Sequence, residues 1–67
     1  MKSIIDSGIR LIDSINNSFM VGDMNTVEYS KEALQQTLVV LNALNNDLTL
    51  EQKKKLQIGN FLLKRMK

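Results

Sequence analysis

Cysteine, histidine, proline and tryptophan are all absent from this 67-residue chain, and the first two absences narrow its chemistry most. Without cysteine the chain forms neither a disulfide nor a thiolate metal site, which excludes a disulfide-stapled secreted mini-protein. Without histidine it lacks the commonest transition-metal ligand and the side chain that titrates near neutral pH. The seven acidic residues are scattered rather than gathered in one loop, as a hard-cation site requires. We therefore expect no metal and no other cofactor.

Long apolar runs are also missing. No stretch of about 18 apolar residues occurs, so we expect no membrane span. The N-terminal sequence MKSIIDSGIR carries charges inside its apolar part, which makes it a poor signal peptide. These absences predict a soluble cytoplasmic protein.

The short length predicts a single domain, residues 1–67, with marginal stability of its own. Small folds usually gain stability from disulfides, metals or assembly, and the composition removes the first two. We therefore expect the chain to bind a protein partner and to form a homodimer.

Leucine, glutamine, glutamate, lysine and methionine are plentiful, and these residues favour helix. Apolar residues at spacings of three and four predict one helix at about residues 3–20 and a second, with a broader apolar side, at about 24–45. Gly22 suits the turn between them, with Asp23 or Asn25 as the N-cap. Thr49 and Gln52 fit a capping box that begins a third helix at about 50–65. The fold class is then all-α, a three-helix up-down bundle that dimerisation can extend into a larger bundle.

Two glycines interrupt the apolar faces of the predicted helices. Gly8 lies within the apolar arc of the first helix, and Gly59 within that of the third. A mid-helix glycine costs about 1 kcal/mol relative to alanine, and neither residue is at a helix end, so capping does not explain them. We predict that Gly8 and Gly59 each mark a close helix crossing, either with one another or with other helices.

No catalytic constellation is evident, and we expect no enzyme activity. Asp6 and Asp13 lie on the polar face of the first helix, where solvation is the simpler interpretation. Residues 1–46 carry three basic and five acidic side chains, whereas residues 47–67 carry six basic and two acidic ones. The basic clusters at 53–55 and 64–67 have no interleaved aromatic residues for base stacking, which disfavours nucleic-acid binding.

The predicted third helix is apolar over more of its girth than two neighbours in a small bundle can cover. We expect the surplus to form either a dimer interface or a surface for an amphipathic partner helix. The residues that we predict to bind a partner are Ile58, Phe61, Leu62, Arg65 and Met66.

Several of these segments together resemble the flagellin-specific export chaperone family. The segment IIDSGIRLIDSI is similar to that family's LLYDGALRFLxxA, with Asp6, Gly8, Arg10 and Leu11 in like positions. Gly22-Asp23 resembles the turn that follows, and a helix with an alanine and paired aliphatic residues comes next in both. Residues 58–66 are similar to LYDYMxRRL, although Gly59 and Phe61 stand where the family usually has tyrosines.

The resemblance covers the central three helices of that family. It implies a helical, cytoplasmic, non-catalytic chaperone of the bacterial flagellum that holds the C-terminal region of flagellin before export. Two alternatives remain open at this point: a small helical co-chaperone of type III secretion, and a small DNA-binding or antirepressor-type regulator.

Overall fold

The computed structural model describes residues 2–66, and within that range the chain is all-α, as the sequence predicts, with no strand. The first helix begins one residue before its predicted start, and the last helix has the predicted bounds. A short 3-10 turn, η1, precedes the last helix. The elements are α1 (Lys2–Met20), α2 (Met24–Tyr29), α3 (Lys31–Ala43), η1 (Asn45–Asp47) and α4 (Leu50–Arg65).

The predicted second helix is wrong in one respect, because the segment from 24 to 45 is not continuous. It divides at Ser30 into α2 and α3, and α3 already ends at Ala43. Neither proline nor glycine stands at the break, and the apolar pattern continues through it. The bend instead follows from packing, since α2 lies against α1 with Val27 fully buried.

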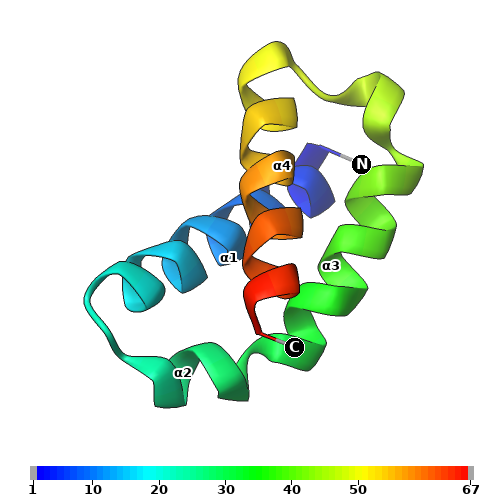
Figure 1. Ribbon diagram of the computed structural model, residues 1–67. Helices are drawn as coiled ribbons and strands as arrows, with labels where there is room; N and C mark the ends of the chain where they lie inside the picture. Colours follow the sequence, from blue (N-terminus) through cyan, green and yellow to red (C-terminus); the bar gives the residue numbers. More distant parts are fainter. Residues whose placement is uncertain (1, 67) are drawn as a thin grey trace.

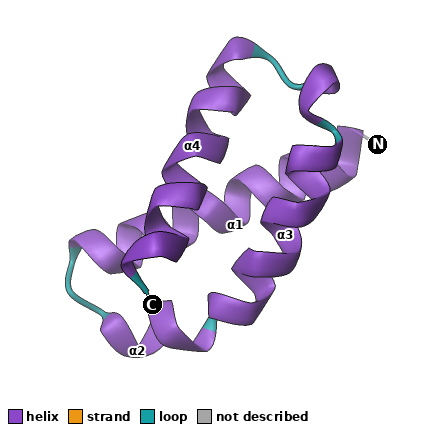
Figure 2. Cartoon of the chain, turned by 45° about the vertical axis from the view of Figure 1, so that its right-hand side comes forward, coloured by secondary structure: helices purple, strands orange, loops and turns teal. Residues whose placement is uncertain are grey.

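The helices form a bundle, but not the up-down bundle of three aligned helices that the sequence predicts. Helices α3 and α4 lie side by side and run in opposite directions, with η1 at the turn between them (Figure 1). Helix α1 runs across both of them (Figures 1 and 2). As the breadth of its apolar side predicts, α3 packs against both α1 and α4.

The core lies where α1, α3 and α4 meet, and α2 and the turn before α4 each add one side chain. Its members are all aliphatic, and among the residues whose burial is described no polar side chain is buried. The core residues are Ile5, Ile12, Ile15, Val27, Leu34, Leu38, Leu41, Leu48, Leu56 and Leu62.

Hydrogen-bonded caps determine where α2 and α4 begin. Gln52 donates its backbone N–H to Thr49 Oγ1 at 3.2 Å, and Thr49 donates its own N–H to Gln52 Oε1 at 2.9 Å, which confirms the predicted capping box. Asp23, rather than Asn25, is the N-cap of α2. It follows Gly22, whose φ of 83° is in the left-handed region that glycine adopts without strain.

Candidate protein interface

Three of the five residues predicted to bind a partner share the outer face of α4. Phe61 is 55% exposed and Ile58 is 39% exposed, and Arg65 is exposed beside them. The prediction for Leu62 is wrong, because this side chain is 1% exposed and is packed in the core. Met66 is also partly buried and packs against the core, so it contributes little to an outer surface.

Two further residues extend this face toward the start of α4. Leu50 is 73% exposed, and Lys54 is exposed one turn later. The sequence-based prediction did not include them, although Lys54 lies four residues after Leu50 and four before Ile58, which places all three in the same row. We call this row the α4 strip and define it as Leu50, Lys54, Ile58, Phe61 and Arg65.

The strip faces outward because the opposite side of α4 is committed to the core. Leu56, Gly59 and Leu62 are buried. At 100° per residue Leu56 and Gly59 lie on the side of the helix away from Phe61 and Arg65, and Leu62 lies at the edge of that side. The strip spans fifteen residue steps, which is about 22 Å of helix. It is therefore an extended ridge, not a cleft.

Phe61 and Arg65 are joined within the strip. The guanidinium carbon of Arg65 lies 5.7 Å from the centroid of the Phe61 ring, which is a cation–π distance. One turn of helix separates the two residues, so the backbone itself sets this pairing. The contact brings the apolar ring of Phe61 and the N–H donors of Arg65 together at one place on the strip.

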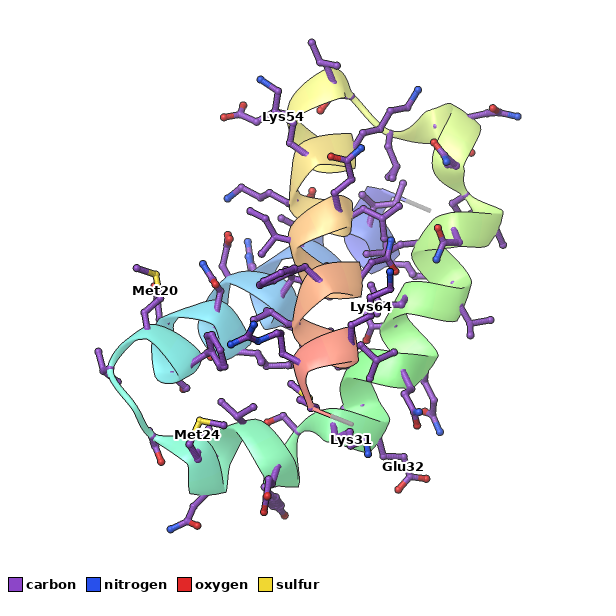
Figure 3. All side chains as sticks on the ribbon, in the orientation of Figure 1. Met20, Met24, Lys31, Glu32, Lys54 and Lys64 are labelled. Carbon is purple, nitrogen blue, oxygen red and sulfur yellow. The ribbon has the colours of Figure 1, made fainter. Side chains whose placement is uncertain are left out.

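Lys55 is separate from the strip, because it holds α4 to α1. Its Nζ lies 2.7 Å from Asp13 Oδ2, and both side chains are partly exposed. Within the described part of the chain this is the single ion pair. Lys53, Lys54, Lys64 and Arg65 therefore have no acidic partner among those residues (Lys54 and Lys64 are labelled in Figure 3).

Gly8 and Gly59 are both buried, and both face α3. A Cβ atom on Gly8 would lie 3.1 Å from the Thr37 methyl and 3.2 Å from a methyl of Leu41. A Cβ atom on Gly59 would lie 2.8 Å from a methyl of Leu38 and 3.0 Å from one of Ile12. Each glycine thus lies opposite side chains of other helices, and neither is among the nearest neighbours of the other.

A second surface lies between α1 and α3. It is a groove of about 500 Å³ with Gly8 in its lining, and no residue of α4 contributes to it. All of its lining residues are uncharged, and its apolar members include Ile4, Leu11 and Val40.

The acidic side chains of the described residues do not gather into one site. Within residues 2–66 no three acidic side chains come together as a cation site would need. Asp6 and Asp13 are both half-buried, and Asp13 is occupied by its ion pair with Lys55. No helix in the described range is long and apolar enough to cross a membrane. The two basic clusters of the sequence are on α4, except that Lys67 lies outside the described residues.

Comparison of the chain with protein-family models, with curated proteins and with solved structures finds no match. The α4 strip and the groove between α1 and α3 are therefore interpreted from their own geometry and chemistry.

Proposed function

We propose that this protein is a non-catalytic binding module that holds an amphipathic helix of a partner protein along the α4 strip. The observation that carries the proposal is the exposure of Leu50, Ile58 and Phe61 in one row of a helix whose other side is already fully packed. Aromatic residues and arginine supply most of the binding energy in protein interfaces, and Phe61 with Arg65 is the one such pair on this helix.

The ridge shape favours helix-on-helix packing rather than insertion of an extended peptide. Side chains spaced at three and four residues form ridges that fit the grooves of a second helix. With α4 as one member of the pair, the partner helix covers about 22 Å of apolar and basic surface. Such a module would act in a chaperone-like manner, because it covers an apolar helix face that would otherwise aggregate.

The resemblance of the sequence to flagellin-specific export chaperones makes the C-terminal region of flagellin the first partner to test. A substrate of a type III secretion apparatus is the second. Phe61→Ala should weaken binding of the true partner by about tenfold or more, roughly 1.4 kcal/mol. The melting temperature should change little, because the ring is more than half exposed.

The test pairs this variant with a matched control. Tyr29 on α2 is an exposed aromatic residue outside the strip, so Tyr29→Ala should leave the affinity unchanged. A titration of the intact protein with a flagellin C-terminal peptide, together with a calorimetric melt, gives both readings. Absence of binding at hundreds of micromolar excludes flagellin. Equal losses of affinity in Phe61→Ala and Tyr29→Ala would exclude the α4 strip as the binding surface.

DNA binding is the main alternative, and salt separates the two. Affinity for DNA falls steeply with salt because bound counterions are released, whereas apolar helix packing is far less sensitive. The basic clusters at 53–55 and 64–67 contain no aromatic residue for base stacking, so they would support mainly a sequence-independent contact with phosphates.

We further propose that the groove between α1 and α3 pairs with the same groove of a second copy in a homodimer. Its uncharged lining favours this pairing, since two identical surfaces meet across a two-fold axis without opposing like charges. The α4 strip pairs poorly with itself, because Lys54 and Arg65 would face cations of the second copy.

A further inference from the structure

The charges around the α4 strip indicate the chemistry of its partner, and this inference rests on the binding function proposed above. We infer that the strip binds an acidic amphipathic helix, one that carries carboxylates on both sides of a short apolar row. The strip supplies two cations, Lys54 and Arg65, with Ile58 and Phe61 between them.

Two of the lysines on α4, Lys53 and Lys54, do not contribute to the stability of the fold through an ion pair or the helix dipole. Lys64 and Arg65 lie in the last turn, where cations stabilise the negative end of the helix dipole. Lys53 and Lys54 lie near the start of α4, where the dipole offers cations no stabilisation, and no acidic residue in the described range pairs with them. Four unpaired cations thus surround three exposed apolar side chains, with Glu51 as the one acid on this helix.

The position of Arg65 is suited to a carboxylate in particular. Its guanidinium lies over the Phe61 ring, 5.7 Å from the centroid, and this contact favours one placement of its planar set of N–H donors. Arginine forms bidentate, charge-assisted hydrogen bonds with carboxylates, and ordering the fork in advance reduces the entropy lost on binding. A partner acid next to an apolar residue would then contact the guanidinium and the ring together.

The spacing of the cations sets the spacing expected in the partner. Lys54 and Arg65 are eleven residues apart, which is three turns of helix or about 16 Å. A helix that lies along α4 would match them with two carboxylates about three turns apart. Apolar residues at spacings of three and four would occupy the interval and pack on Ile58 and Phe61.

The same pattern argues against an anionic membrane as the partner. A helix that lies on a lipid surface presents a continuous apolar face, with its cations on the polar side. Here Lys54 separates Leu50 from Ile58 within the row, and the continuous apolar face of α4 is buried in the core. Helix α1 of a second copy is a poor partner as well, because its exposed residues, which include Arg10, Ser14 and Asn17, offer no apolar row.

The experiment uses the intact protein and two synthetic helical peptides of about five turns. One peptide has a leucine row flanked by two glutamates eleven residues apart, and the other has glutamine in place of each glutamate. We expect the acidic peptide to bind about tenfold more tightly or better at low salt, and this advantage to fall as salt rises. Lys54→Glu and Arg65→Glu should each remove most of the advantage. Arg10→Glu, an equal change of charge at an exposed site on α1, should not.

The outcomes separate this inference from the proposed function. Equal binding of the two peptides, with loss of both in Phe61→Ala, leaves the binding function standing and overturns the acidic partner. Binding of neither peptide overturns both. Tighter binding to vesicles with an anionic phospholipid, or to duplex DNA, than to the acidic peptide also overturns the inference.

Discussion

At the scale of single residues, the space around Gly8 and Gly59 determines which substitutions these positions tolerate. A methyl group on Gly8 would touch the ends of the Thr37 and Leu41 side chains at 3.1 to 3.3 Å, so small shifts can accommodate it. A methyl group on Gly59 would approach Leu38 at 2.8 Å and Ile12 at 3.0 and 3.1 Å, and both of those side chains are buried. The two positions therefore differ in how much added volume they tolerate.

Alanine substitutions at the two positions should separate these effects. Alanine gains about 1 kcal/mol of helix propensity at either site. At Gly8 this gain should offset the tight contact, so we expect Gly8→Ala to be as stable as the wild type. At Gly59 overpacking costs about 1–3 kcal/mol and should dominate, so Gly59→Ala should be the less stable variant.

Urea denaturation of both variants measures the difference. Gly8→Leu serves as the overpacked control at the first site and should lose roughly 1–3 kcal/mol. Equal stability of Gly59→Ala and Gly8→Ala would show that the Leu38 and Ile12 side chains move aside freely.

Periodicity located both glycines on buried faces, but it could not decide between Phe61 and Leu62. These neighbours differ by 100° around the helix, and the apolar arc of the third helix is wide enough to include both. Only the packing of α1 and α3 against α4 determines which of them is inside. The same argument explains why Lys54 was not predicted to bind a partner. Its place in the row of Ile58 becomes informative only once the buried side of the helix is known.

At the scale of elements, α4 is the helix best determined by local sequence. Its capping box satisfies two backbone N–H donors at the N-terminus, those of Thr49 and Gln52, and its observed bounds are those predicted. The break at Ser30 could not be predicted in the same way, because Ser30 makes no side-chain cap hydrogen bond. It depends on α2 turning to bury Val27 against α1, a contact between distant segments.

Removal of the α4 cap should destabilise the whole domain. Thr49→Ala leaves the Gln52 N–H without its acceptor, and loss of such a cap typically costs about 1 kcal/mol. Ser14→Ala is the control, since it removes an exposed hydroxyl within α1 and should be neutral or slightly stabilising. The measurement is the free energy of unfolding in urea. A Thr49→Ala variant as stable as Ser14→Ala would contradict the role assigned to the cap.

The cap of α2 should make stability depend on pH in acid. Asp23 accepts hydrogen bonds from Thr26 Oγ1 at 2.6 Å and from the Thr26 N–H at 3.3 Å, and these lower its pKa below the ordinary value of 3.8. The ionised carboxylate therefore stabilises the folded state above pH 3.8, and this contribution is lost as the pH falls through the lowered pKa.

Asparagine in place of Asp23 separates the effect of the carboxylate charge from that of the cap, because asparagine can cap the helix but carries no charge. Wild type should be more stable than Asp23→Asn at neutral pH, and the difference should shrink toward zero as the pH falls below 3.8. Thermal melts of both proteins across that range give the difference. A constant difference between the two proteins at all pH values would show that the charge of Asp23 has no part in the cap.

At the scale of the whole molecule, charge distinguishes two surfaces, for which we propose different partners. The α4 strip is basic, so two copies of it would repel each other, and it suits a partner of opposite charge. The groove between α1 and α3 is lined by uncharged residues and can meet its own copy. The sequence predicted both kinds of contact on the surplus apolar face of the third helix, whereas the groove is formed by residues of α1 and α3. Figure 2 shows the crossing of these two helices.

The last prediction tests assembly through that groove with two adjacent valines of α3. Val40 lines the groove, whereas Val39 is exposed outside it. If grooves pair across a two-fold axis, Val40→Lys buries a charge against its own copy, which is strongly unfavourable. Sedimentation should show wild type and Val39→Lys associating at hundreds of micromolar, with Val40→Lys remaining monomeric. A monomeric wild type, or the same behaviour in both variants, would exclude this interface. The α4 strip would stay free in such a dimer, so Val40→Lys should bind the acidic peptide as tightly as the wild type does.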